Sequence, residues 1–237
     1  MHKALVTGGS RGIGLSIAHS IVADGGSVMI TGRDRVRIDQ AVAELSTAAG
    51  DAARVAGAAV DVRDRAAVAE LVADTARRFG GLDTLINNAG VGAFSDVASM
   101  TGEDWDRTIG TNLTGVFNCT RAALPELRKA GGAWIINIAS LAGRNPFEGG
   151  AAYCASKAGL IAFSDSLMLE VRYEDIRVSV VLPGSVATDF SSRGGGAAAD
   201  WKLSPDDVAE VVMDLIKHPG RSLPSRVEIR PSKPKKA

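Results

Sequence analysis

Tyr153 and Lys157 are the two side chains whose types and spacing first indicate chemistry. They lie four positions apart within residues 151–173, a stretch predicted to be helical, so both face one side of that helix. A tyrosine is a weak acid with a reference pKa near 10. A nearby ammonium favours the phenolate and is expected to lower that pKa by roughly 1–3 units. The pair therefore predicts an acid–base group that protonates a carbonyl oxygen or deprotonates an alcohol.

Ser140 lies 13 residues before the tyrosine and directly follows a predicted strand at 134–139. Ligands of open α/β sheets bind at the carboxyl ends of the strands, where this serine is expected to lie. Its hydroxyl is expected to hydrogen-bond the same substrate oxygen and to stabilise the charge that develops there.

A glycine-rich turn, TGGSRGIG at 7–14, joins a predicted strand at 3–7 to a predicted helix at 12–24. Its glycines permit a tight turn, a close approach of backbone to a pyrophosphate and close packing of the helix on the sheet. Backbone N–H groups and the helix dipole then hold the phosphates. The turn lacks the Lys-Ser/Thr pair of nucleotide triphosphatases, so we expect a dinucleotide site. The residues expected to bind it are Gly8, Ser10, Arg11, Gly12, Ile13 and Gly14.

The end of the second predicted strand distinguishes NADP from NAD. An NAD site carries an acidic side chain about 20 residues after the glycines, where it binds the ribose hydroxyls. Here Thr31 ends the strand and Arg33 follows, placed to form charge-assisted bonds with a 2′-phosphate, with Arg11 as a second cation. The competing acid, Asp34, is predicted to cap the next helix. We therefore expect NADP.

Short apolar runs alternate with amphipathic stretches along the chain. The runs predict strands at 3–7, 28–31, 54–60, 82–87, 134–139, 177–182 and 226–230. The longer stretches predict helices at 12–24, 34–49, 65–79, about 102–129, 151–173 and 205–217. Strands that are apolar on both sides suit a sheet covered on both faces. The alternation predicts an α/β fold, a doubly wound (Rossmann) parallel sheet of about seven strands in a single domain over residues 1–230.

Composition excludes several other classes of protein. The 237 residues carry 27 Lys+Arg and 27 Asp+Glu, and this balance argues against a nucleic-acid binder. Two cysteines and three histidines show no metal-ligand spacing, so no metal is expected. No apolar run reaches the roughly 18 residues of a membrane span. An N-terminus that enters a strand at once predicts a cytoplasmic protein with no membrane contact. Residues 191–200 are predicted to be a mobile loop, and 231–237 a disordered basic tail.

Taken together and in this order, the motifs resemble the short-chain dehydrogenase/reductase family over nearly the whole chain. They are TGGSRGIG (7–14), Asp61-Val62, Asn87-Asn88-Ala89-Gly90, Asn112, Ser140, the Tyr153/Lys157 pair, and Pro183-Gly184 with Thr188. The resemblance implies that Lys157 also binds the nicotinamide ribose and that Asn112 holds a water in a proton relay. It implies further cofactor contacts from Asp61, Val62, Asn88, Ala89, Gly90, Pro183, Gly184, Val186 and Thr188. Asn87 is expected to brace the sheet instead.

These residues predict an oxidoreductase that transfers hydride between NADP(H) and a small carbonyl or alcohol substrate. One alternative is a 3-oxoacyl-carrier-protein reductase, although the ending SRVEIRPSKPKK lacks the glycine-rich terminal motif usual there. Another is an NADP-binding sensor or scaffold without activity. The residues that flank the catalytic motifs predict a mostly apolar pocket of Phe94, Leu141, Asn145, Phe147, Phe190 and Trp201. Arg144 is either a carboxylate ligand or an ordinary surface arginine. The resemblance, and two long helices apolar around much of their circumference, predict a homodimer or homotetramer.

Overall fold

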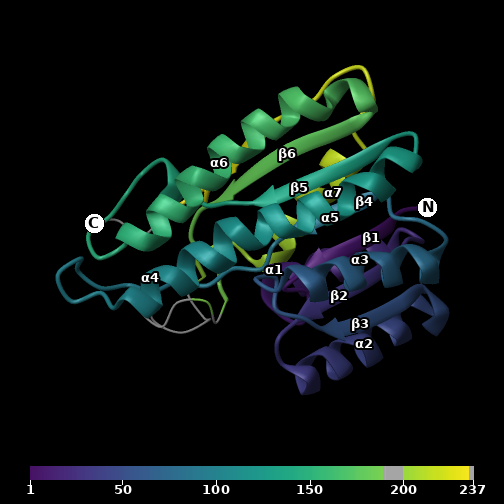
Figure 1. The fold of residues 1–237 in the computed structure, drawn as a ribbon, viewed down its shortest axis with the longest axis horizontal. Coiled ribbons are helices and arrows are strands. Elements are labelled where there is room, and N and C mark those ends of the chain that lie inside the picture. Colours follow the sequence, from purple (N-terminus) through teal and green to yellow (C-terminus); the bar gives the residue numbers. More distant parts are fainter. Residues whose placement is uncertain (189, 191–199, 235–237) are drawn as a thin grey trace.

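Short apolar segments pair as parallel strands in this computed structural model, which describes residues 1–188, 190 and 200–234. Within these residues the strands form one seven-stranded sheet in the order β3-β2-β1-β4-β5-β6-β7. The strands are β1 (Lys3–Thr7), β2 (Ser27–Gly32), β3 (Val55–Ala59), β4 (Thr84–Asn87), β5 (Ala133–Ile138), β6 (Ile176–Pro183) and β7 (Arg226–Ile229). The direction of winding reverses between β1 and β4, and this switch point opens a crevice for ligands. The predicted doubly wound sheet is confirmed (Figure 1).

Helices connect the strands, and four of the α-helices in the described residues begin at side-chain caps, which are Asp34, Asp64, Thr101 and Ser204. The helices are α1 (Gly12–Ala23), α2 (Arg35–Ala49), α3 (Arg65–Phe79), α4 (Gly102–Ile109), α5 (Gly115–Lys129), α6 (Ala151–Val171) and α7 (Pro205–Ile216). Short 3-10 turns are η1 (Ala52–Arg54), η3 (Leu141–Gly143) and η4 (Arg172–Glu174). The Asp34 carboxylate accepts a hydrogen bond from the Arg37 backbone N–H at the start of α2, which confirms its predicted capping role.

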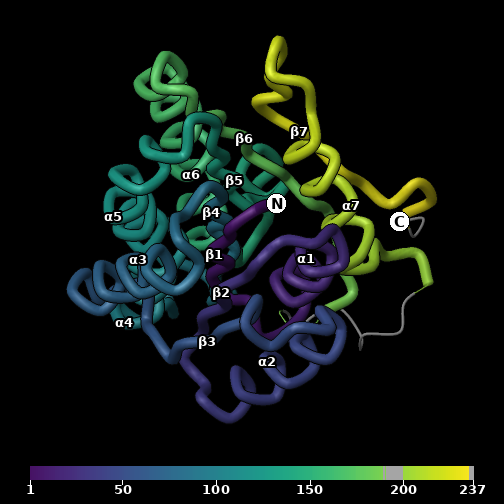
Figure 2. The backbone as a smooth tube through the Cα atoms, turned by 90° about the vertical axis from the view of Figure 1, so that its right-hand side faces the viewer, coloured from purple at the N-terminus to yellow at the C-terminus, as the bar shows by residue number. Residues whose placement is uncertain are grey.

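Two hydrophobic cores lie on opposite faces of the sheet. Ala4 and Val6 of β1 pack in the core that Ile17, Ile38 and Val212 supply from α1, α2 and α7. The residue between them, Leu5, packs on the other face, with side chains of α3, α5 and α6. Figure 2 shows the same division, with α1, α2 and α7 on one side of the strands and α3, α5 and α6 on the other. Because both faces are covered, the strands are apolar on both sides, as predicted.

The long helix predicted at about 102–129 is interrupted. Between α4 and α5 the chain widens into a π-helical segment, η2 (Gly110–Thr114), which carries Asn112. Both amide atoms of the Asn112 side chain bind groups outside this helix, which holds the wide turn in place. Such π segments are often found at functional sites. The periodicity of apolar residues did not reveal the break, because the residues on both sides keep helical spacing.

Two predicted segments fall largely or partly outside the described residues. Of the predicted mobile loop, residues 191–199 lie outside them, as do residues 235–237 of the predicted basic tail. Among the helices of the described residues, none combines the length and apolar character that crossing a membrane requires.

Candidate active site

The carboxyl ends of the central strands bring the predicted motifs together. β1 leads into the glycine turn, β4 ends at Asn87, β5 is followed by Ser140, and β6 ends at Pro183. All these strands are parallel, so the motifs lie along one edge of the sheet. In Figure 1, α4 extends beyond this same edge.

The glycine turn has a backbone conformation that lets other groups approach its main chain closely. Gly8 and Gly12 have φ values of +64° and +54°, a backbone conformation that side chains rarely adopt. A methyl group added at Gly12 would lie 3.3 Å from Thr188 Cγ2. The turn and the residues after β6 therefore come within contact distance. The first turn of α1 points its backbone N–H groups into this region, which suits phosphate groups.

Hydrogen bonds between Thr7, the last residue of β1, and Asn88, which follows β4, hold the glycine turn in place. The Asn88 amide nitrogen donates to the carbonyl oxygens of Thr7 and Gly8, each at 3.0 Å. The Thr7 hydroxyl accepts from the backbone N–H groups of Asn88 and Ala89, again at 3.0 Å. The Asn88 amide nitrogen is thus committed to the turn, and the contact of Asn88 with the ribose and pyrophosphate side of the cofactor stays a prediction. Sequence reasoning missed Thr7, whose partner is 81 residues away.

Asn87 joins the sheet to the helices, as predicted. Its side-chain nitrogen donates to Asn137 Oδ1 at 2.8 Å and to Thr120 Oγ1 at 3.3 Å. Asn137 in turn donates to the Ser164 hydroxyl of α6 at 2.8 Å. This buried polar network ties β4 and β5 to α5 and α6.

The predicted 2′-phosphate site lies at the end of β2. Arg33 is exposed, and Asp34 is occupied as the cap of α2. A methyl group added at Gly32 would lie 3.2 Å from Ser10 Oγ, so the glycine turn and the end of β2 are adjacent. Arg11, the predicted second cation, is also exposed and precedes the first residue of α1.

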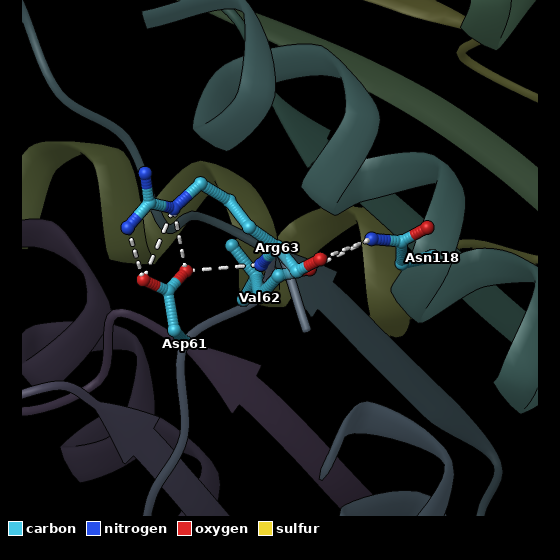
Figure 3. Close-up of polar contacts among 4 residues, drawn as sticks. All are labelled: Asp61, Val62, Arg63 and Asn118. Atoms are coloured by element: carbon cyan, nitrogen blue, oxygen red, sulfur yellow. Dashed lines mark hydrogen bonds and ion pairs between the residues drawn. The ribbon is translucent and has the colours of Figure 1, made fainter. Parts of the chain in front are cut away.

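Asp61 is held by a fork that the sequence did not predict (Figure 3). Arg63 donates to both carboxylate oxygens, with Nη2 2.7 Å from Oδ2. This hydrogen bonding from Arg63 lowers the pKa of Asp61, and the positive charge of Arg33 acts in the same direction. The neighbouring Val62 is buried, and its carbonyl accepts from Asn118 of α5 at 3.0 Å. Asp61 is thus fixed as an anion beside the end of β3, where the adenine was expected.

Tyr153 and Ser140 meet, as the spacing predicted. The Ser140 hydroxyl lies close enough to the Tyr153 phenol to lower its pKa, and it accepts from the Ala142 backbone N–H at 3.1 Å. The second contact caps the short helix η3 and fixes the serine rotamer. The phenol and the hydroxyl can therefore address one substrate oxygen together.

Lys157 and Asn112 approach each other beside Gly90. Lys157 is buried at 4% exposure, and its ammonium donates to the Ile138 carbonyl at 2.8 Å. A methyl group added at Gly90 would lie 3.4 Å from Asn112 Oδ1 and 3.7 Å from Lys157 Nζ. A side chain at position 90 would therefore be in van der Waals contact with both groups. Asn112 is held by Val91 and by the Ser156 hydroxyl, a partner that sequence reasoning missed.

The acidity of Tyr153 differs from expectation. Burial raises the pKa of the phenol, and the hydrogen bond with Ser140 opposes that rise. The sequence predicted that the Lys157 ammonium would lower the pKa, but Lys157 Nζ lies 5.9 Å from the ring centroid and points to the Ile138 carbonyl. The protein's own groups therefore keep Tyr153 protonated at neutral pH, the form needed to donate a proton.

Burial also lowers the pKa of Lys157, from its ordinary value of 10.5 to about 8. Between pH 8 and 10.5 the unfolded chain binds a proton at this position that the folded chain does not. The free energy of unfolding gains a contribution that rises with pH across that window, on the order of 3 kcal/mol in total. Below pH 8 Lys157 is protonated in both the folded and the unfolded chain, so the full cost of burying its charge lowers the free energy of unfolding.

We expect Lys157→Met, which keeps an unbranched stem without the charge, to lack this contribution. The measurement is urea unfolding of both proteins at several pH values from 7 to 10.5. The free energy of the wild type should rise relative to that of the variant as pH increases. A difference that stays constant across the window would contradict the buried, easily deprotonated ammonium.

Four aromatic rings form a cluster around the reactive phenol. The Tyr153 ring lies 5.5 Å from that of Phe94 and 5.6 Å from that of Phe190, between centroids. Phe147 extends the cluster at 5.9 Å from Phe94. The structure therefore brings together three of the predicted pocket residues. Among the described ring pairs, none joins Trp201 to this cluster.

Two further predicted pocket residues are Leu141, the first residue of η3, and Asn145, which follows η3. Leu141 is partly buried, and a methyl group added at Gly184 would lie 3.2 Å from its Cδ1. Asn145 is exposed and its amide nitrogen is 3.4 Å from the Leu141 carbonyl. These contacts place Leu141, but not the Asn145 side chain, against the end of β6.

The segment that follows β6 is held by backbone contacts close to the end of that strand. The Gly184 N–H donates to the Ile229 carbonyl of β7 at 2.8 Å. Val186 forms an isolated parallel bridge with Leu203, so the chain that leaves β6 is held where it returns toward α7. Pro183, Gly184, Val186 and Thr188 thus lie at the sheet edge, opposite the glycine turn.

Comparison with known proteins agrees with this fold. Residues 2–195 match the short chain dehydrogenase family. A 3-oxoacyl-[acyl-carrier-protein] reductase of Chlamydia pneumoniae is 36% identical over 222 residues, which span 90% of this chain and 88% of that protein. An alcohol dehydrogenase of the archaeon Thermococcus sibiricus, complexed with 5-hydroxy-NADP, matches at a TM-score of 0.89 and 28% identity, covering 98% of both chains. A closed form of serine dehydrogenase complexed with NADP⁺ matches at a TM-score of 0.88 and 33% identity, covering 99% of this chain and 96% of that one.

The fold and the site define a dinucleotide-binding oxidoreductase. The chain belongs to the short chain dehydrogenase family, as the order of its motifs predicted.

Proposed function

We propose that this protein is an NADP(H)-dependent oxidoreductase that interconverts a small carbonyl compound and its alcohol. The observation that carries the proposal is the meeting of Ser140 and Tyr153, with Lys157 on the next turn of α6, at the edge of the sheet that also holds the glycine turn. A site that only bound a nucleotide would not require an acid–base phenol paired with a hydroxyl.

In the reducing direction, Tyr153 acts as the general acid. Its raised pKa keeps the proton on the phenol until the substrate oxygen gains negative charge. The phenol O–H then donates its proton to that oxygen, while the Ser140 hydroxyl hydrogen-bonds the same atom and stabilises the charge. The substrate loses its carbonyl π bond and becomes the alcohol. In the oxidising direction the phenolate accepts the proton.

The residues fit NADP(H). The glycine turn presents backbone N–H groups to a pyrophosphate, and Asn112 and Lys157 lie together beside Gly90, where the nicotinamide ribose would bind. When bound, NADPH supplies the hydride for the carbonyl carbon. Lys157 would bind the ribose hydroxyls, and Asn112 would hold a water that returns protons to the site. Support for the cofactor also comes from the two solved structures, whose dehydrogenases are complexed with NADP⁺ or an NADP derivative.

We propose the remaining cofactor contacts from where the residues lie at the carboxyl edge of the sheet. Asp61 and Val62 would meet the adenine, and Ala89 and Gly90 would line the ribose and pyrophosphate. Gly184, Val186 and Thr188 would contact the nicotinamide from the opposite side of the crevice.

Arg33 should set the preference for NADPH over NADH. A charge-assisted hydrogen bond to the 2′-phosphate contributes roughly 1.5–3 kcal/mol. We therefore expect Arg33→Ala to raise KM for NADPH by about 10–100-fold and to leave KM for NADH within about 2-fold. Arg77→Ala is the matched control, because Arg77 is an exposed arginine of α3 paired with Asp74. Equal losses for both cofactors, or a wild type that prefers NADH, would contradict the assignment.

The alternative activity is 3-oxoacyl-carrier-protein reduction. The relative from Chlamydia pneumoniae supports it at 36% identity. The ending SRVEIRPSKPKK differs from the glycine-rich one usual in that class. A steady-state comparison of an acetoacetyl thioester with simple ketones would distinguish the two, and a strong preference for the thioester would favour the alternative.

The quaternary state stays a proposal. Phe117 of α5 and Leu169 of α6 are large apolar side chains that are 40% and 58% exposed. Helices with apolar exposed positions are often covered by another copy of the chain. We propose a homodimer or homotetramer in which these helices are covered. A cytoplasmic location likewise stays a prediction.

A further inference from the structure

Three phenylalanine rings gather beside the ring that carries the reactive phenol. The centroids of Phe94 and Phe190 lie 5.5 and 5.6 Å from that of Tyr153, and the centroid of Phe147 lies 5.9 Å from that of Phe94. Phe147 is 47% exposed and Phe190 is 38% exposed, so this aromatic surface is open. Exposed apolar surface next to a reactive group is typical of a substrate site.

Two glycines make room for these rings. A methyl group added at Gly92 would lie 2.6 Å from Phe94 Cζ and 3.2 Å from Phe190 Cε1. One added at Gly150 would lie 2.7 Å from Phe147 Cε2. Side chains at these positions would push the rings away from Tyr153. The rings can therefore occupy these positions because Gly92 and Gly150 carry no side chains.

Arg144, the sequence's candidate for binding a carboxylate, already has one. It forms an ion pair with Glu228 of β7, which also binds Arg230 at 2.9 Å. Both guanidinium groups lower the pKa of Glu228, so this carboxylate stays ionised at neutral pH. Glu228 already neutralises Arg144, and a second anion bound there would face the Glu228 charge.

Lys157 is likewise committed, with its ammonium on the Ile138 carbonyl and its predicted role toward ribose. A carboxylate placed against the phenylalanine rings would lose part of its water without gaining a paired cation, and this loss costs free energy.

We infer that the site accepts uncharged carbonyl compounds with an aryl or comparable apolar group beside the C=O, and discriminates against those that carry a carboxylate. The inference rests on the proposed function and names the substrate class of the same site. It assigns Phe147 as a residue that selects for the apolar group and Glu228 as one that withholds Arg144 from anions.

Two matched pairs of compounds test this directly. Methyl benzoylformate and benzoylformate share a phenyl ketone and differ in charge, and methyl pyruvate replaces the phenyl group by methyl. Initial rates of NADPH oxidation at pH 7.5 give kcat/KM for each. We expect the aryl ester to exceed the aryl acid by about 100-fold or more, and methyl pyruvate by about 10-fold or more.

Variants separate the two parts of the inference. Phe147→Ala should reduce the advantage of the aryl ester over methyl pyruvate by about 10-fold, whereas Tyr173→Ala, at an exposed aromatic side chain of η4, should leave it unchanged. Glu228→Gln should raise kcat/KM for benzoylformate relative to its ester by about 5–10-fold. Unchanged ratios in these two site variants would overturn the roles of Phe147 and Glu228.

Failure of the inference and failure of the proposed function give different results. Reduction of carbonyl compounds with the acid preferred to its ester, or with both equal, would overturn the inference alone. An absence of NADPH oxidation with every carbonyl compound would overturn the proposed function, and the inference with it.

Discussion

Tyr153→Phe should lower kcat for carbonyl reduction by about 10³-fold or more. General acid–base catalysis typically contributes 10²–10⁴-fold, and the substitution removes the only atom of this side chain that carries the transferable proton. The ring itself is retained, so its contacts with Phe94 and Phe190 persist. We therefore expect unchanged thermal stability, within about 1 °C, and a Kd for NADPH within about 2-fold of the wild type. The measurements are steady-state kinetics, a melting curve and a fluorescence titration.

The sequence supplies a matched control, since it contains two tyrosines. Tyr173 is 85% exposed in η4, and its hydroxyl contacts Arg172. Tyr173→Phe makes the same chemical change away from the site and should leave kcat within about 2-fold. Substantial turnover in Tyr153→Phe, above about a tenth of the wild-type kcat, would show that another group delivers the proton.

Gly14→Ala should destabilise the protein and abolish tight cofactor binding. The added methyl group would lie 2.3 Å from the Gly8 carbonyl oxygen and 2.5 Å from Asn88 Nδ2, closer than atoms can pack. Either α1 moves away from the glycine turn or the hydrogen bonds from Asn88 break. Alanine inside a helix is intrinsically favoured over glycine by about 1 kcal/mol. Overpacking costs about 1–3 kcal/mol or more and acts against backbone here, so the clash dominates.

We expect a net loss of about 1–2 kcal/mol in the free energy of unfolding and at least a 10-fold rise in Kd for NADPH. Gly102→Ala provides the control, because no atom lies within 4 Å of the added methyl group at the start of α4. That variant should be neutral or slightly stabilising and should bind NADPH normally. If Gly14→Ala were as stable and bound NADPH as tightly as Gly102→Ala, the close packing of α1 on the turn would be wrong.

The fold could be predicted from the sequence because its signals are local and repeated. The strands other than β7 are short apolar runs, and each long helix except the interrupted one keeps its periodicity from end to end. Asp34 is an example of such a local signal. Its position before a helical pattern predicted that it caps α2, and because its carboxylate has this role it was not assigned to the ribose hydroxyls of NAD.

The site was predictable in its members but not in its internal contacts. Spacing brought Ser140, Tyr153 and Lys157 together, because a strand end and one helix face are fixed by periodicity. The fork between Arg63 and Asp61, and the brace between Thr7 and Asn88, depend on side-chain rotamers that no local pattern encodes. The same is true of Arg144 and Glu228, 84 residues apart.

The direction of the Tyr153 pKa shift was also beyond sequence reasoning. Spacing on a helix shows that Lys157 is near the tyrosine, but not that its ammonium points to the Ile138 carbonyl. Nor does it show how deeply the phenol is buried. Burial is a property of the assembled structure, and it outweighs the expected effect of the neighbouring charge.

The most direct test of the account is to follow hydride from cofactor to product. The protein is incubated with methyl benzoylformate and NADPH that carries deuterium at one or the other face of nicotinamide C4, and the alcohol is analysed by mass spectrometry. We predict that one of the two labelled cofactors delivers one deuterium per alcohol formed, in equal amount to the NADPH consumed, and that Tyr153→Phe yields essentially none. Tight binding of NADPH with no label in any alcohol would contradict the assignment of this protein as a carbonyl reductase.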